Sequence, residues 1–189
     1  YNRIEQKMKL LDKNREINIY GKLYLLSDHH WFHKNIIEYS NRPFSGVDEM
    51  NREMTRRWNE VVGPDDTMLH IGDIAMGKRA YLPKVVENLN GYKILIKGNH
   101  DRSDKQMLDA GFNEVYKELT IVTSGGKRIM VRHKPQDADK LIGYSFQFHG
   151  HTHSEVKVSG KLINFSVEAW DYYPVDIDDV FNMIGVKNG

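Results

Sequence analysis

Three histidines alternate along the stretch FHGHTHS, where His149, His151 and His153 are separated by single residues. Imidazoles at this spacing rarely serve packing alone, and the stretch by itself leaves open whether they bind metal or form a basic surface strand. The chain has no cysteine, so any metal ion must be held by nitrogen and oxygen. The choice depends on whether the rest of the chain supplies matching ligands.

Such side chains follow a series of short apolar runs. Each run is rich in Leu, Ile, Val or aromatic residues and is followed by Asp, Asn or His, a pattern typical of buried strands with polar C-terminal edges. The side chains that can bind a metal ion or move a proton are Asp28, His30, Asp73, Asn99, His100, Asp101, His133, His151 and His153. Because open α/β sheets bind ligands at the carboxyl ends of their strands, we expect this set to converge on one edge.

The set is sufficient for two divalent cations. Two metal ions about 3.5–4 Å apart share a bridging ligand, and a carboxylate with two oxygens does this well. The histidines and the amide would complete both shells, and imidazole suits Zn, Fe, Ni and Mn-type ions better than Ca or Mg. The sequence therefore predicts a binuclear metal site.

The order of these residues resembles a known family. The chain has DHH at 28–30, GD at 72–73, GNHD at 98–101, a histidine in VRHKP, and GHTH at 150–153. This order is similar to the pattern D-x-H, G-D, G-N-H-[DE], H and G-H-x-H of the calcineurin-like metallophosphoesterases. The segments FHKNIIEYSNRPF and DYYPV further resemble a small, uncapped bacterial and bacteriophage branch, and the similarity covers nearly the whole chain after residue 20.

The resemblance implies a role for each motif residue. The expected ligands of one metal ion are Asp28, His30 and His153. The expected ligands of the other are Asn99, His133 and His151. Asp73 would bridge the two ions. His100 would stand beside the substrate phosphate as a proton donor or charge stabiliser, with Asp101 as its orienting partner.

The implied activity is hydrolysis of a phosphoric ester by metal-activated hydroxide. We expect two divalent ions, Mn²⁺ first, with Fe, Zn, Ni and Co as alternatives. The expected substrate is a phosphoester small molecule or nucleotide, with phosphodiesters such as cyclic nucleotides or nucleic-acid ends preferred. A phosphomonoesterase and a catalytically inactive scaffold or binding module of the same fold remain alternatives.

Other polar residues receive more local interpretations. His33 and Arg42 lie after the first motif, where a loop would cross the mouth of the site, so we expect both to contact substrate together with Asn99. The alternative for Arg42 is a solvated loop residue. His70 is interpreted as a satisfied core histidine and His29 as a residue without a direct role. His149 would be either a hydrogen-bond donor behind the ligands or a simple strand residue.

The elements between the motifs predict an α/β (α+β) fold. Apolar stripes predict helices over 47–62, 79–91, 103–111 and 176–185. Segments 119–131 and 155–167 are typical of hairpins. Together with these elements, the family resemblance implies one domain over 1–189, a metallophosphoesterase-type two-layered mixed β-sheet sandwich flanked by helices, with the active site at the C-terminal ends of strands. Residues 1–16 would be a docked helix or an arm.

Composition limits the partners. The 27 basic and 26 acidic side chains nearly cancel, which argues against extended nucleic-acid binding or an anionic membrane surface. No apolar run approaches the roughly 18 residues of a spanning helix, and the start lacks the apolar core of a signal peptide. These features predict a cytoplasmic protein without a membrane partner, and they leave the oligomeric state open.

Overall fold

The computed structural model describes residues 8–186, and its centre is a five-stranded mixed sheet. The strand order is β12-β3-β4-β5-β6. The bounds are β3 Leu23–Leu26, β4 Thr67–His70, β5 Tyr92–Ile96, β6 Glu114–Tyr116 and β12 Val175–Asp176. The strands β3 to β6 are parallel, and β12 pairs antiparallel with β3. The carboxyl ends of the parallel strands therefore lie along one edge, as the motif residues require.

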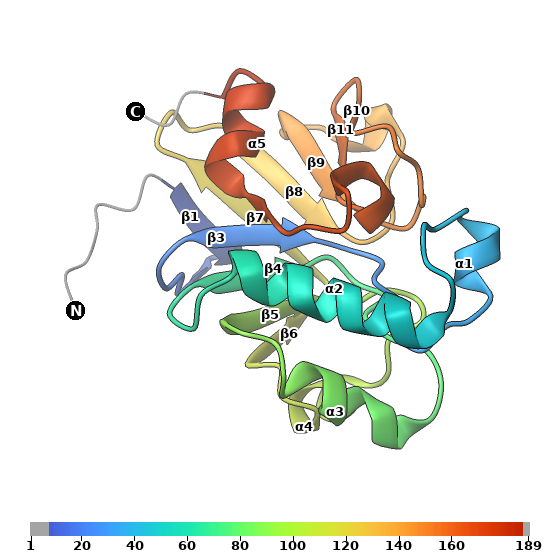
Figure 1. Ribbon diagram of the computed structural model, residues 1–189. Coiled ribbons are helices and arrows are strands. Elements are labelled where there is room, and N and C mark those ends of the chain that lie inside the picture. Colours follow the sequence, from blue (N-terminus) through green and yellow to red (C-terminus); the bar gives the residue numbers. More distant parts are fainter. Residues whose placement is uncertain (1–7, 187–189) are drawn as a thin grey trace.

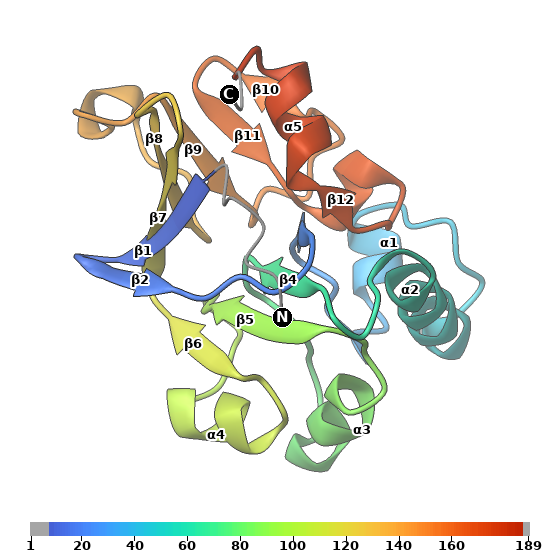
Figure 2. The same ribbon diagram turned by 90° about the vertical axis from the view of Figure 1, so that its left-hand side faces the viewer.

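A second, seven-stranded sheet faces the first (Figures 1 and 2). Its order is β10-β11-β9-β8-β7-β1-β2. The bounds are β1 Met8–Asp12, β2 Arg15–Ile17, β7 Glu118–Thr123, β8 Arg128–Arg132, β9 Phe146–His149, β10 Val158–Ser159 and β11 Leu162–Asn164. The predicted hairpins are confirmed as the antiparallel pairs β7–β8 and β10–β11. The pairs β8–β9 and β9–β11 are parallel, so the predicted mixed sandwich is confirmed.

Helices flank the sandwich (Figure 1). Their bounds are α1 Ile36–Tyr39, α2 Val47–Val61, α3 Leu82–Val86, α4 Asp104–Asp109 and α5 Ile177–Met183, with the 3-10 turns η1 Arg79–Tyr81, η2 Ala138–Lys140 and η3 Val167–Trp170. The stripe of α2 buries Met50, Met54 and Trp58 as predicted. Ser103 begins α4, as the helix predicted over 103–111 implies, and it forms a capping box with Gln106. The helix predicted over 79–91 is shorter, with its first turn as η1 and its end at Val86.

Two apolar cores hold these layers together. One lies between the five-stranded sheet and α2, α3 and α4, and it includes Trp31, Trp58 and Met68. The other lies between the two sheets, where Leu25, Leu69 and their neighbours meet side chains of the seven-stranded sheet and α5. Alternate residues of β3 and β4 face opposite cores, so both faces of these strands are buried. This burial fixes the positions of the strand ends.

The prediction for residues 1–16 is wrong over the part that the structure describes. Met8–Asp12 and Arg15–Ile17 form a β-hairpin rather than a helix or an arm, and β1 also pairs with β7 (Figure 2). Leu10 and Ile17 lie opposite each other and point into the core between the sheets. The helical spacing of apolar residues was misleading because pairing with β7 and burial of one strand face outweigh local pattern. Residues 1–7, including Ile4, lie outside the described residues.

Substitution of Leu10 tests whether this hairpin is part of the core. Leu10→Ala should lower the free energy of unfolding by about 2–5 kcal/mol, because the side chain is fully buried. The matched control is Leu11→Ala on the opposite face of β1, which is only half-buried and should cost about 1 kcal/mol or less. Urea denaturation of both variants measures the difference. Equal effects would show that the hairpin does not pack as described.

Candidate metal centre

The carboxyl ends of strands from both sheets meet at one rim of the sandwich. Asp28 and His30 follow β3, Asp73 follows β4, and Asn99, His100 and Asp101 follow β5. His133 follows β8, and His151 and His153 follow β9 of the other sheet. The sequence led us to expect these side chains at one edge of one sheet. They do come together, but they follow strands of two sheets that face each other.

A first cluster consists of Asp28, His30 and His153. One ligand atom from each residue lies within 4.8 Å of the others. The Nε2 atoms of His30 and His153 are each 3.9 Å from Oδ1 of Asp28. This group could hold one metal ion.

A second cluster consists of Asp73, His133 and His151, again with ligand atoms within 4.8 Å of one another. Oδ2 of Asp73 lies 3.3 Å from Nε2 of His133 and 3.6 Å from Nε2 of His30. Asp73 therefore lies between the two clusters, where a bridging ligand would stand. Asn99 is exposed on the adjacent loop after β5.

Unpartnered atoms test whether these residues fit a metal ion. Oδ1 of Asp28, both ring nitrogens of His30 and Nε2 of His133 are buried without a hydrogen bond. The other oxygen of Asp28 accepts from the backbone N–H of His151 at 2.8 Å and from Ser166 Oγ at 3.0 Å. Buried polar atoms without partners are costly, and divalent cations would satisfy the lone pairs of Asp28 Oδ1, of His133 Nε2 and of one ring nitrogen of His30. The donor set therefore fits metal ions with nitrogen and oxygen ligands.

The second nitrogen of His133 supports the same assignment. Its Nδ1 donates a hydrogen bond to the carbonyl of Ile71 at 2.8 Å. This bond fixes the proton on Nδ1 and leaves the lone pair of Nε2 directed at Asp73. An imidazole oriented in this way is ready to bind a metal ion.

The backbone at the clusters adopts an uncommon conformation. The φ angles are 61° at Asp28, 52° at His30, 57° at Asp73, 71° at His151 and 49° at His153. Residues other than glycine rarely have positive φ, and such strain is typical of functional sites. The backbone therefore turns sharply at each of these residues. These turns let side chains two positions apart, such as those of Asp28 and His30, reach the same rim of the sandwich.

Two motif glycines allow the loops to approach the carboxylates. A Cβ atom at Gly98 would collide with the side chain of Asp73, and one at Gly150 would collide with Ser27 and Asp28. Glycine is required here for close backbone approach. The G-N-H-D and G-H-T-H motifs are thus held against the two aspartates.

The pKa values of the two aspartates are shifted in opposite directions. Burial raises the pKa of the Asp28 carboxyl. Burial also opposes ionisation of Asp73, but the interaction with His133 and the hydrogen bond from the backbone N–H of His100 hold the pKa of Asp73 below its usual range. Burial lowers the pKa of His30 to about 2, so this imidazole stays neutral. A neutral imidazole at His30 is the protonation state that metal binding needs.

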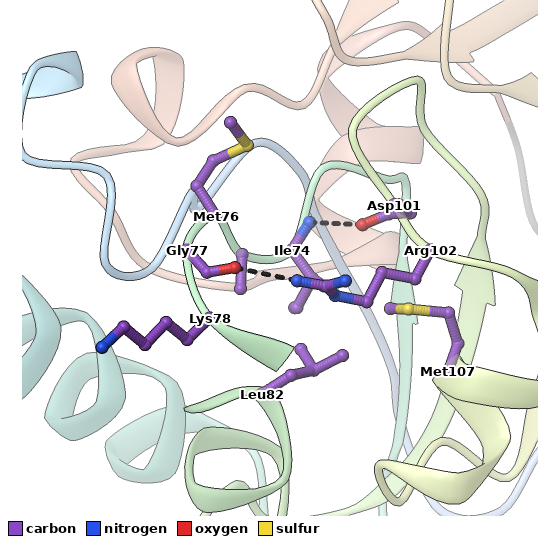
Figure 3. Close-up of a pocket in the computed structure, with 9 residues that line it drawn as sticks. Ile74, Met76, Gly77, Lys78, Leu82, Asp101, Arg102 and Met107 are labelled. Atoms are coloured by element: carbon purple, nitrogen blue, oxygen red, sulfur yellow. Dashed lines mark hydrogen bonds between the residues drawn. The ribbon is translucent and has the colours of Figure 1, made fainter. Parts of the chain in front are cut away.

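Asp101 holds two loops together. Its Oδ2 accepts from the backbone N–H groups of Asp73 and Gly98, both at 2.8 Å, and its Oδ1 accepts from Ile74 N at 2.9 Å (Figure 3). Among the described contacts, none joins the Asp101 carboxylate to the imidazole of His100. We therefore propose that Asp101 acts by positioning these loops instead of orienting the His100 ring.

A small pocket lies behind Asp101. Ile74, Leu82 and Met107 contribute apolar side chains to its lining, and Arg102 donates to the carbonyl of Gly77 beside it (Figure 3). Its volume of about 10 Å³ suits roughly one water molecule. This pocket is therefore too small to accept a phosphoester.

His100 and His33 lie at the rim of the first cluster. His100 is exposed, its ring centroid is 5.5 Å from that of His30, and its backbone N–H donates to Oδ1 of Asp73 at 2.9 Å. The ring centroid of His33 lies 5.8 Å from that of His30. Both positions are compatible with the substrate contacts expected from the sequence.

Arg42 lies elsewhere than expected. Its side chain is buried below the first cluster, where it donates to the carbonyls of Asp28 and His29 and to Glu168. It neither reaches across the mouth of the site nor stands in solvent. We propose that it positions the site instead of clamping phosphate.

The remaining histidines are buried away from the clusters. His29 and His70 share a hydrogen bond of 2.8 Å, and His29 stacks on Trp31. His149 lies in β9, and its Nδ1 is 2.8 Å from the carbonyl of Gly150. None of the three belongs to either group of candidate ligands among the described residues.

Glu168 and Ser166 are site residues that motif reasoning did not identify. Ser166 Oγ bonds Asp28, and Oε1 of Glu168 lies 3.2 Å from Nδ1 of His153. Ser166 lies at the end of the hairpin predicted over 155–167, and Glu168 follows that hairpin in a stretch without a predicted role. The only local signal in the sequence is that polar residues follow an apolar run. This signal does not indicate that Ser166 would contact Asp28 or that Glu168 would contact His153.

Comparisons with known proteins agree with this geometry. The family model described as the calcineurin-like phosphoesterase superfamily domain matches residues 22–165. An uncharacterized protein of Methanocaldococcus jannaschii is 34% identical, over 86% of this chain and 91% of its own length. The gene 66 protein of Mycobacterium phage D29 is 28% identical, over 82% of this chain and 93% of its own length.

A solved structure also resembles this chain. A protein of unknown function from Aquifex aeolicus aligns with a TM-score of 0.68 and 28% identity, covering 86% of this chain and 98% of its own. In a separate finding, none of the described helices combines the length and apolar character needed to cross a lipid bilayer.

Substitution of Asp73 tests whether it bridges two metal ions. Asp73→Asn keeps the shape of the side chain but removes its charge, so metal content should fall from two ions per chain to about one or fewer. Elemental analysis after gel filtration in Mn²⁺ measures the content. The control is the exposed Asp65→Asn, which should keep both ions. Two tightly bound ions in Asp73→Asn would contradict the bridging role.

Proposed function

The chain belongs to the calcineurin-like phosphoesterase superfamily, and on this premise we propose that it is a binuclear metal-dependent phosphodiesterase. The observation that carries the proposal is the pair of Asp/His clusters with Asp73 between them. One cluster is Asp28, His30 and His153, and the other is Asp73, His133 and His151, to which we add Asn99 from the neighbouring loop. No serine or cysteine nucleophile is needed for such a reaction.

The metal ions would supply electrophilic assistance. When bound, two divalent cations lower the pKa of a shared water and neutralise charge on the phosphoryl oxygens. We propose Mn²⁺ as the preferred ion because the donor set mixes imidazoles with carboxylates and an amide and contains no thiolate. Fe, Zn, Ni and Co remain alternatives that the same donors would accept.

His100 is the proposed general acid. Its exposed ring faces the rim, and its backbone is fixed by the hydrogen bond to Asp73 Oδ1. An imidazole held beside the leaving oxygen can donate a proton as the phosphorus–oxygen bond breaks. Asn99 precedes His100 on the same loop, and the ring of His33 lies 5.8 Å from that of His30, so both would contact the phosphate or the leaving group.

The charge around the site supports a diester more than a monoester. A monoester dianion is best held by an arginine fork, yet Arg42 is committed to Glu168 and two carbonyls. Arg102, on the loop after the G-N-H-D motif, donates to the carbonyl of Gly77. With neither of these arginines directed at the phosphate, a diester with one negative charge is the better match.

Turnover of model substrates tests the activity. The protein with Mn²⁺ should hydrolyse bis-p-nitrophenyl phosphate, with a higher kcat/KM than for p-nitrophenyl phosphate. Absorbance of the released nitrophenol measures both, with the Asp73→Asn protein as the control. A preference for the monoester would favour a phosphomonoesterase. No turnover of either ester with Mn²⁺, Ni²⁺, Co²⁺ or Zn²⁺ would favour a non-catalytic binding module.

A leaving-group series tests the role of His100. His100→Ala should reduce kcat by about 10²–10⁴-fold for diesters with poor alkoxide leaving groups, because these need protonation. The reduction in kcat should be much smaller for diesters with p-nitrophenol as leaving group, because this phenolate leaves without a proton. The slope of log kcat against leaving-group pKa is the measurement. Parallel lines for the parent and His100→Ala proteins would show that His100 is not the acid.

A further inference from the structure

A buried ion pair lies under the first cluster. Arg42 and Glu168 have side-chain exposures of 0% and 3%, and two guanidinium nitrogens of Arg42 donate to Oε1 of Glu168 at 3.0 and 2.9 Å. Arg42 comes from the loop after α1, whereas Glu168 belongs to η3. Burial of two charges is costly unless each finds additional hydrogen bonds, so their other contacts indicate what the pair does.

The other contacts of Arg42 go to the turn that carries two candidate ligands. Its Nη1 donates to the carbonyl of His29 at 2.6 Å, and its Nη2 donates to the carbonyl of Asp28 at 2.7 Å. This turn is the segment in which Asp28 and His30 have positive φ angles. A planar guanidinium can bind both carbonyls and the carboxylate together, which a lysine ammonium does less well. Arg42 therefore holds a strained turn in the conformation that directs Asp28 and His30 to the rim.

The other contact of Glu168 goes to the third residue of the same cluster. Its Oε1 lies 3.2 Å from Nδ1 of His153. A carboxylate in this place keeps the proton on Nδ1 and leaves the lone pair of Nε2 for a metal ion. The Nε2 atom of His153 lies on the side of Asp28 Oδ1, at 3.9 Å.

The second cluster is supported differently. His133 is oriented by the carbonyl of Ile71, and Asp73 accepts a hydrogen bond from the backbone N–H of His100. Among the described contacts, neither Arg42 nor Glu168 touches Asp73, His133 or His151. The ion pair thus serves one cluster and leaves the other to backbone groups.

We propose that Arg42 and Glu168 are positioning residues that set the affinity of the Asp28–His30–His153 position for its metal ion, independently of the other position. The inference rests on the proposed function only in that the clusters bind divalent cations. Hydrolysis of a phosphoester is not required for it. Removal of partners that orient metal ligands usually weakens metal binding by about 10–100-fold, and here the loss falls on one of two sites.

Manganese titration of Glu168→Gln tests the proposal. The substitution keeps the size of the side chain and removes the charge that holds both Arg42 and His153. Electron paramagnetic resonance distinguishes a coupled pair of Mn²⁺ ions from a single ion. The expected result is a rise of about 10–100-fold in one Mn²⁺ dissociation constant, with the other changed by about twofold or less. Equal weakening of both positions, or no change at either, would overturn the proposal.

Arg57→Lys is the matched control. Arg57 lies over the ring of Tyr172, and it donates to the carbonyl of Asp171 at 2.7 Å. Both partners are close to η3 in the sequence. It does not touch the residues of either cluster among the described contacts. This variant should bind both ions as the parent protein does. If it reproduces the loss seen in Glu168→Gln, a general disturbance of this region explains the effect and the specific role is refuted.

A double-mutant cycle shows whether Glu168 acts through His153. In a His153→Ala background, Glu168→Gln should weaken Mn²⁺ binding less than it does in the parent protein, because the imidazole that it orients is absent and only its hold on Arg42 remains. A full additional loss in the double variant would refute action through His153. If Glu168→Gln does not yield folded protein, Arg42→Lys replaces it. The same selective loss is then expected, and equal weakening of both positions would again overturn the proposal.

The parent protein separates this inference from the proposed function. Two bound Mn²⁺ ions without turnover of any phosphoester would refute the phosphodiesterase and leave the positioning role intact. Turnover with selective metal loss in Glu168→Gln would support both. Failure of the parent protein to bind a second ion would refute the positioning role.

Discussion

The burial of two carboxylates governs the rest of this site. Asp28 and Asp73 follow neighbouring parallel strands, and they are 0% and 1% exposed. An ionised carboxylate in such a place costs several kcal/mol unless donors or cations compensate its charge. One oxygen of each accepts hydrogen bonds from main-chain or hydroxyl groups, and the other faces imidazoles. The histidines, the positive φ angles and the close glycines are all arranged around these two oxygens.

Much of this arrangement could be predicted because strand ends leave a clear pattern. An apolar run that stops at Asp, Asn or His marks both the strand and its functional edge, so the ordered motifs identified residues that the fold brings together. The helix α2 and the cap of α4 were equally accessible, since a stripe of apolar residues and a serine before an acidic turn are local signals. That the two sheets face each other was expected from the family resemblance rather than from these patterns.

Other features depend on contacts that no local pattern contains. Arg42 looks like a surface arginine before a proline, and only its pairing with Glu168, 126 residues away, explains its burial. The strands β1 and β2 are short and charged, so their sequence carries no alternation strong enough to compete with helical spacing. Their place is decided by a free edge on β7 and by the core that Leu10 and Ile17 complete. Burial of charge and use of a sheet edge are properties of the whole fold.

The supports of the two clusters also connect the site to the order of the chain. The second cluster is oriented by backbone groups at the ends of β4 and β5. The first needs Glu168 and Ser166, which reach Asp28 and His153 only because the chain after β11 bridges to Ser27 and β12 then pairs with β3. Docking of this late segment completes both the five-stranded sheet and the first cluster. The side chains that bury the sandwich edge and those that orient three candidate ligands therefore lie on the same late segment, so we expect stability and metal affinity at this position to be coupled.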